Sequence, residues 1–322
     1  MMNRRMRLLI AYDGSSCADA ALDDLKRAGL PHDAQALVLS VADILPPVNT
    51  RAPAQPNPDW IAAAVEKAHA RAAQAVEEAR TMAARASERI QSDHPGWEVR
   101  PEACGDSPAW AIIAKAGEWQ ADLVVVGSHG HSGIRRLVLG SVSQKVVHHT
   151  ACSVRVARGR KSRADSPVRL VLGADGSPDS DMALRSLAGR AWPAGSAVRV
   201  VTAIDTLMSL SLAFALSLPA EGDLSGRNET DERALISRMN QAAVEKLLPT
   251  GLAVSSLVEE GNPKHLLVEE ARRWKADCIF VGAKGLRGLE RFLLGSVSTA
   301  VTAHAHCSVE VIRTGKADSP GS

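Results

Sequence analysis

The sequence predicts an α/β protein made of two tandem doubly wound domains. Three observations lead to this prediction. Segments with the apolar pattern of strands alternate with helical patterns along the whole chain, which favours parallel sheets joined by right-handed crossovers. A glycine motif occurs twice, in the same order and with the same spacing. Half of the 322 residues is also close to the usual size of one domain, ~100–150 residues.

The first half is predicted to alternate strands and helices. Ser15 or Ser16 is placed to cap the first helix, and Pro108 suits the first turn of the third helix. The predicted strands are Leu8–Asp13, Ala36–Val41, Trp97–Cys104, Leu123–Gly127 and Ser153–Ala157. The predicted helices run from Ser15 or Ser16 to about Ala28, from about Asp59 to Ser92, from Pro108 to Trp119 and from Ser141 to His149.

The second half repeats this order. Its predicted strands lie near Arg169–Ala174, Ala197–Ile204, Leu252–Val258, Cys278–Gly282 and Ser308–Ile312. The first domain is therefore assigned to residues 1–158 and the second to residues 168–313. Segment 159–167 is polar and basic, which is typical of a linker, and residues 314–322 are predicted to form a disordered tail.

The glycine motif has the spacing Gly-x2-Gly-x9-Gly-Ser. Its first copy comprises Gly127, Gly130, Gly140 and Ser141, and its second copy, 155 residues later, comprises Gly282, Gly285, Gly295 and Ser296. Each copy follows an apolar strand and leads into a helical pattern. Such a loop suits a phosphate, because exposed backbone N–H groups and the helix N-terminus both attract anions. The sequence therefore predicts a nucleotide site that is built twice.

Each predicted contact has a chemical reason. Glycines let backbone N–H groups come close to phosphate oxygens, where a Cβ atom would obstruct them. The first helical turn after each loop offers hydroxyls and free N–H groups to an anion. The residues of these turns are Ser141, Val142 and Ser143 in the first half and Ser296, Val297 and Ser298 in the second. Asp13 and Asp175, at the ends of the first strands, can accept hydrogen bonds from a ribose or an adenine amino group.

Simpler interpretations of these residues exist. A glycine loop after a strand often forms only a tight turn, and Asp13 and Asp175 could serve as helix caps. Four arginines that follow the first part of each loop are close enough in sequence to reach phosphates, although solvent is their commoner partner. They are Arg135, Arg136, Arg287 and Arg291. Two matching loops, each with its aspartate, favour the nucleotide site over these alternatives.

A protein-bound metal and two other nucleotide folds are disfavoured. His129 and His131 could bind a metal, but the second half has Lys284 and Leu286 at these positions. A Rossmann dinucleotide site needs Gly-x-Gly-x-x-Gly after the first strand, and a Walker A loop needs Gly-x4-Gly-Lys-Ser/Thr. Neither pattern is present. Mg²⁺ could still accompany the phosphates of a bound nucleotide.

With these motifs, both halves resemble the universal stress protein domain, over about residues 5–158 and 167–313. The resemblance implies Rossmann-like domains, each with a five-stranded parallel sheet of order 3-2-1-4-5, and ATP at the carboxyl ends of strands one and four. It also implies backbone contacts to the base from Val41 and Ala203. Domains of this family pair through their fifth strands, so residues 153–157 would meet residues 308–312 in an intramolecular pseudo-dimer.

Composition favours a cytoplasmic protein without a nucleic-acid or membrane partner. The formal net charge is +2, which provides no strong field toward either partner. Five cysteines are scattered without a Cys-x-x-Cys spacing, as expected in a reducing compartment. The apolar run after the basic N-terminus is too short for a signal peptide, and the longest other run, Leu207–Leu218, is too short to span a bilayer.

The predicted function is an ATP-binding stress-response or signalling module, whose nucleotide state tunes its stability or its binding of an unidentified protein partner. No arrangement of residues indicates a general base or a nucleophile, which favours binding over fast turnover. Two alternatives stay open. The first is a slow ATPase or an autophosphorylating enzyme, with the serines after Gly140 or Gly295 as acceptors. The second is a nucleotide-independent scaffold, suggested by the apolar segment Leu207–Leu218, which could also support a further homodimer.

Overall fold

The computed structural model describes residues 4–44, 58–130, 139–159, 166–204, 229–285 and 294–313. Several sequence-based predictions fall outside these residues. They concern most of the linker, the tail 314–322, the segment Leu207–Leu218, His131, and the arginines 135, 136, 287 and 291. The described residues contain the predicted strands and both copies of the glycine motif.

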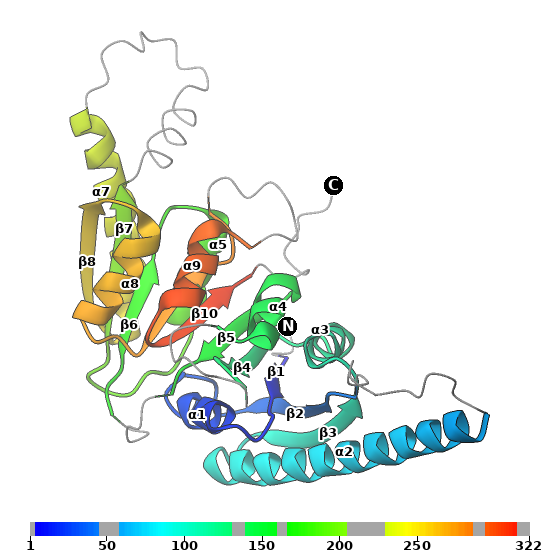
Figure 1. Ribbon diagram of the computed structural model, residues 1–322. Coiled ribbons are helices and arrows are strands. Elements are labelled where there is room, and N and C mark those ends of the chain that lie inside the picture. Colours follow the sequence, from blue (N-terminus) through cyan, green and yellow to red (C-terminus); the bar gives the residue numbers. More distant parts are fainter. Residues whose placement is uncertain are drawn as a thin grey trace, which may run out of the picture.

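The two halves contain the same succession of elements (Figure 1). The strands are β1 (Met6–Ala11), β2 (Ala34–Ala42), β3 (Glu98–Gly105), β4 (Leu123–Gly127), β5 (Ser153–Ala157), β6 (Arg169–Gly173), β7 (Ala197–Ile204), β8 (Ala253–Glu260), β9 (Cys278–Gly282) and β10 (Ser308–Ile312). The helices are α1 (Ser16–Leu25), α2 (Pro58–Asp93), α3 (Pro108–Glu118), α4 (Ser141–His149), α5 (Pro178–Ala188), α7 (Glu229–Leu247), the short 3-10 turn η2 (Leu248–Thr250), α8 (Pro263–Arg273) and α9 (Ser296–His304).

The strands form one ten-stranded sheet of order β3-β2-β1-β4-β5-β10-β9-β6-β7-β8. Each half contributes five parallel strands in the predicted order 3-2-1-4-5. The halves meet at the centre, where β5 and β10 pair antiparallel with Val156 opposite Val309 and Val154 opposite Val311. The predicted fold class is therefore confirmed.

Helices cover both faces of the sheet, and the two faces differ. On one face, α3, α4, α8 and α9 pack over a single core that runs across both halves through Val154, Val156, Val309 and Val311. On the other face the cores are separate, with α1 and α2 over the first half and α5 and α7 over the second. Strands β4 and β9 are buried on both faces, which is why their sequences are continuous apolar runs.

The helix ends follow local chemistry. Ser15 is the N-cap of α1, and its hydroxyl accepts a hydrogen bond from the Ala18 N–H at 3.1 Å. The predicted end of this helix near Ala28 is too late, because α1 ends at Leu25 and a turn leads to Gly29 with φ of 63°. This turn brings the chain to the start of β2.

Candidate nucleotide site

Both glycine loops lie where the strand order of a half reverses. The first glycine loop (residues 127–130 and 140) follows β4, and Asp13 follows the neighbouring strand β1. The second glycine loop (residues 282–285 and 295) follows β9, and Asp175 follows the neighbouring strand β6. The carboxyl ends of such strands are the usual place for a ligand in an open α/β sheet.

The structure brings each aspartate against the middle of its loop. A Cβ atom at Gly130 would lie 2.7 Å from Oδ2 of Asp13, and one at Gly285 would lie 2.8 Å from Oδ2 of Asp175. Both distances are shorter than a carbon and an oxygen can approach without displacement. Glycine is therefore required for the carboxylate to lie at the loop, and the same requirement holds in both halves.

The other oxygen of each aspartate holds the following turn. Oδ1 of Asp13 accepts from the Ser15 N–H at 3.0 Å, and Oδ1 of Asp175 accepts from the Ser177 N–H at 2.9 Å. The N-caps of α1 and α5 are Ser15 and Ser177 themselves. The interpretation of the two aspartates as helix caps is therefore wrong, and Oδ2 of each carboxylate faces the loop.

The outer glycines close the loops. The Gly140 N–H donates to the Ser128 carbonyl at 2.8 Å, and the Gly295 N–H donates to the Ala283 carbonyl at 2.7 Å. A Cβ atom at Gly140 would lie 3.3 Å from that same Ser128 oxygen. The spacing of the motif thus reflects a closed loop whose two ends are hydrogen-bonded.

Helices α4 and α9 begin directly after the loops. Their N-caps are Gly140 and Gly295, and within the described residues no side chain makes a cap hydrogen bond to them. Ser141 and Ser296, the first helical residues, are exposed. The N–H groups of these first turns can therefore receive an anion, together with the positive end of the helix dipole.

The third residue of each helix has a different role from the predicted one. Ser143 is buried and its hydroxyl donates to the Gly127 carbonyl at 2.6 Å. Ser298 is also buried, and its hydroxyl lies 2.9 Å from the carbonyl oxygens of Ala283 and Gly295. Each hydroxyl proton is used to brace a loop carbonyl. Between these serines and the exposed ones, Val142 and Val297 are partly buried against the shared core.

The predicted base contacts lie at the ends of the neighbouring strands. Val41 is partly buried near the end of β2, next to Ser40, whose hydroxyl donates to the Tyr12 carbonyl at 2.7 Å. Ala203 lies near the end of β7. On the far side, Val41 pairs with Cys104 of β3, whereas Ala203 pairs with Glu259 of β8. The second position is thus smaller and has an acidic neighbour.

One difference between the loops was missed from the sequence. The Lys284 N–H of the second loop donates to Oδ2 of Asp179 at 3.0 Å, and burial raises the pKa of this carboxyl. Asp179 follows Asp175 by four residues, and the residue four after Asp13 is Cys17, whose carbonyl packs against Gly127. Aligning the two halves from their aspartates would have revealed this exchange of a thiol for a carboxylate.

His129 of the first loop lies half-buried. Its Nδ1 is 3.0 Å from the Ser128 hydroxyl, and burial, with a further contribution from the Arg158 guanidinium, lowers its pKa. Among the described residues no group of three histidine, cysteine or acidic side chains gathers as a metal site would require.

Comparison with known proteins identifies the chain. The sequence profile of the Universal stress protein family matches residues 4–158 and 168–313. The chain belongs to this family. A universal stress protein of Mycolicibacterium smegmatis is 30% identical over 308 residues, which cover 95% of this chain and 96% of that protein. A universal stress protein of Mycobacterium tuberculosis is 30% identical over 230 residues, or 71% of this chain and 73% of the relative.

Solved structures of the family have the same fold. A universal stress protein from Archaeoglobus fulgidus aligns with a TM-score of 0.58 at 19% identity, over 96% of this chain and 98% of that one. A putative universal stress protein from Pseudomonas aeruginosa aligns with a TM-score of 0.55 at 16% identity, over 96% and 93%. Within the described ranges, none of the helices has the length and apolar character needed to cross a membrane.

Proposed function

We propose that this universal stress protein binds ATP at both glycine loops and that the bound nucleotide tunes its stability or its affinity for a protein partner. The observation that supports this proposal most directly is the approach of Asp13 to Gly130, repeated by Asp175 and Gly285. In each half this carboxylate lies beside a loop that leads into a helix N-terminus without a side-chain cap among the described residues. A nucleoside phosphate needs hydrogen-bond acceptors at one end and donors at the other.

Different residues would contact different parts of the ligand. The carboxylates of Asp13 and Asp175 would accept hydrogen bonds from the ribose hydroxyls or the adenine amino group. The backbones of Val41 and Ala203 would contact the base. The phosphates would take N–H groups from the glycine loops and from the first turns of α4 and α9, which begin at Ser141 and Ser296. Mg²⁺ would enter with the phosphates.

The test replaces one loop glycine in each half by alanine. Gly130→Ala and Gly285→Ala would each place a methyl group against an aspartate oxygen, so each should remove ATP binding from its own half. Gly117→Ala is the matched control, because a Cβ atom there meets nothing within 4 Å. Isothermal calorimetry counts the sites, and mass spectrometry of the purified protein identifies any retained nucleotide. Two undiminished sites in the Gly130→Ala/Gly285→Ala variant would disprove the assignment.

The same preparation separates binding from hydrolysis. Release of phosphate over hours in excess Mg-ATP, absent from the double glycine variant, would make the protein a slow ATPase. Transfer of phosphate to Ser141 or Ser296 would be seen as a mass increase of the intact chain. ATP that stays intact on the protein supports the binding module.

We also propose that the pairing of β5 with β10 makes the chain its own pseudo-dimer in solution. Val154 and Val156 are fully buried against Val311 and Val309, so the pairing removes two sheet edges from solvent. Hydrogen exchange of the whole chain tests this. If β5 and β10 are paired, their amides should exchange slowly, whereas rapid exchange along both strands would show that the halves lie apart.

A further inference from the structure

The pairing of β5 with β10 places two equivalent residues opposite each other. Arg155 and Glu310 lie 155 residues apart, the same interval that separates the glycine motifs, so they hold the same position in the two halves. The register pairs them directly. A residue that faces its own counterpart lies on the pseudo-twofold axis that relates the halves. Both side chains are buried, with 2% and 0% of their surface exposed.

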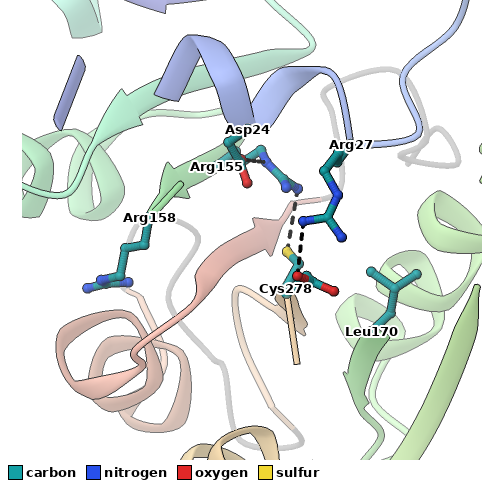
Figure 2. Close-up of a pocket in the computed structure, with 7 residues that line it drawn as sticks. Asp24, Arg27, Arg155, Arg158, Leu170 and Cys278 are labelled. Atoms are coloured by element: carbon teal, nitrogen blue, oxygen red, sulfur yellow. Dashed lines mark hydrogen bonds and ion pairs between the residues drawn. The ribbon is translucent and has the colours of Figure 1, made fainter. Parts of the chain in front are cut away.

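Four charged side chains cross this axis in alternating sign. Asp24 of α1 accepts from Nε of Arg155 at 2.6 Å, and Nη1 of Arg155 donates to Oε2 of Glu310 at 2.9 Å. Arg190, just after α5, donates through Nη1 to the same Glu310 oxygen at 3.0 Å and pairs with Oε1 as well. Figure 2 shows Arg155 between Asp24 and Cys278, beside a small cavity lined by residues of both halves.

The contacts that Arg158 and Arg313 make between the halves obey the symmetry. Arg158, which follows β5, donates from its backbone to the Ser308 hydroxyl at 2.9 Å and from its side chain to the Thr302 carbonyl at 2.6 Å. Arg313, which follows β10, makes the matching contacts to the Ser153 hydroxyl at 3.2 Å and the Val147 carbonyl at 2.7 Å. Because each half supplies the same groups, two copies of either half could make these contacts equally well.

The axial pair is different. If β5 paired with β5 of another chain in this register, Arg155 would face a second Arg155. If β10 paired with β10, Glu310 would face a second Glu310. Like charges opposite each other in a sheet are unfavourable, and burial prevents water from screening them. A buried ion pair also adds little net stability compared with apolar residues of the same size, so a role in partner choice accounts better for its presence.

We infer that Arg155 and Glu310 form an axial charge pair that determines which strands meet at the centre of the sheet. The pair favours β5 against β10 and disfavours β5 against a second β5 or β10 against a second β10. The inference rests on the pairing of β5 with β10 and is independent of nucleotide binding. The symmetric contacts of Arg158 and Arg313 hold the halves together, and the axial charge pair decides which halves meet.

Charge reversal in the full chain tests the coupling between the two positions. Arg155→Glu places a second glutamate opposite Glu310, Glu310→Arg places a second arginine opposite Arg155, and the double variant restores opposite charges. The neighbours of the reversed residues, Asp24 and Arg190, are the same in the single and double variants. In the double variant, position 155 carries the same charge as Asp24 and position 310 the same charge as Arg190, so the double variant keeps one favourable contact, as each single variant does. We therefore expect its melting temperature to fall by much less than the sum of the two single decreases. If the charge reversals are insoluble, the same cycle is measured with Arg155→Met, Glu310→Met and their combination. Decreases that simply add overturn the inference.

Co-expression of the two single variants tests partner choice. Arg155→Glu offers only glutamates at the axis and Glu310→Arg offers only arginines, so opposite charges can meet only between the two chains. We expect native mass spectrometry to find mixed dimers enriched about tenfold or more over dimers of either variant alone. Arg158→Ala co-expressed with Arg313→Ala is the matched control, because it loosens the interface without any charge complementarity and should give no enrichment.

The outcomes distinguish this inference from the proposed pseudo-dimer. Single variants that stay compact monomers with slow exchange in β5 and β10, and that form no mixed dimers, would leave the pairing intact and remove the axial charge pair as its determinant. Rapid exchange along both strands in the unaltered chain would instead overturn the pairing, and with it the inference.

Discussion

The two glycine loops share a backbone and differ in the side chain that faces them. In the second loop the carboxylate of Asp179 accepts the Lys284 N–H at 3.0 Å, whereas the first loop has Cys17 at the matching place. A carboxylate on a loop amide uses one of the donors that a phosphate would need and adds negative charge beside it. The duplication has therefore preserved the shape of the loop while changing its electrostatics, and we expect the first loop to be the tighter ATP site.

The largest difference in stability between the two halves is expected from substitution of the glycines that end β4 and β9. A Cβ atom at Gly282 would lie 2.6 Å from the backbone carbon of Asp179, whereas one at Gly127 would lie 3.0 Å from the Cys17 oxygen. Gly282→Ala should lower the free energy of unfolding by ~1–3 kcal/mol because the backbone must shift, and Gly127→Ala should cost less. Denaturant unfolding of both variants measures this, and an equal or reversed ranking would contradict it.

Removal of the aspartates should affect the two sites separately. Asp13→Ala and Asp175→Ala each delete a charge-assisted hydrogen bond to the nucleotide, so each should weaken ATP at its own loop by about 1–3 kcal/mol, roughly 5- to 150-fold. Calorimetry resolves the two sites if their affinities differ. Unchanged affinity in both variants would mean that the carboxylates only hold the turns to Ser15 and Ser177.

Exchanging the charge between the loops tests their electrostatic difference. Asp179→Asn should strengthen ATP at the second loop, and Cys17→Asp should weaken it at the first, each by roughly 1 kcal/mol or about fivefold. The asparagine retains an oxygen that can accept the Lys284 N–H, so the loop keeps its shape. A second site that does not respond to Asp179→Asn would show that this carboxylate lies too far from the phosphates to matter.

The smallest effect is the pH dependence that Asp179 adds at the second loop. Burial raises the pKa of Asp179, so this carboxyl takes up its proton at a higher pH than an ordinary aspartate. As the pH falls through this raised pKa, the negative charge disappears and ATP affinity at the second loop should rise. Asp179→Asn is the control, because protonation of ATP itself and of His129 in the first loop is common to this variant and the unaltered protein. In Asp179→Asn the rise in affinity at the second loop should be smaller than in the unaltered protein.

The sequence predicted the features that local chemistry determines. The two loops and the position of Asp13 follow from apolar runs and glycine spacing, and the structure places Asp13 against its loop. The strand order was implied by the resemblance to the family, and the structure confirms it. The bracing role of Ser143 could not be predicted, because the direction of a hydroxyl depends on which carbonyl the fold brings near. The axial pair of Arg155 and Glu310 became visible only with the register of β5 and β10, which no local pattern specifies.

The unequal faces of the sheet have a consequence for how the protein melts. The core beneath α3, α4, α8 and α9 is continuous across both halves, so neither half can lose its packing on this face without exposing the other. We therefore expect calorimetry to find a single cooperative transition where two tandem domains would ordinarily give two. Because α4 and α9 both start at a glycine loop, a ligand that tightens one loop should raise the melting temperature of the whole chain.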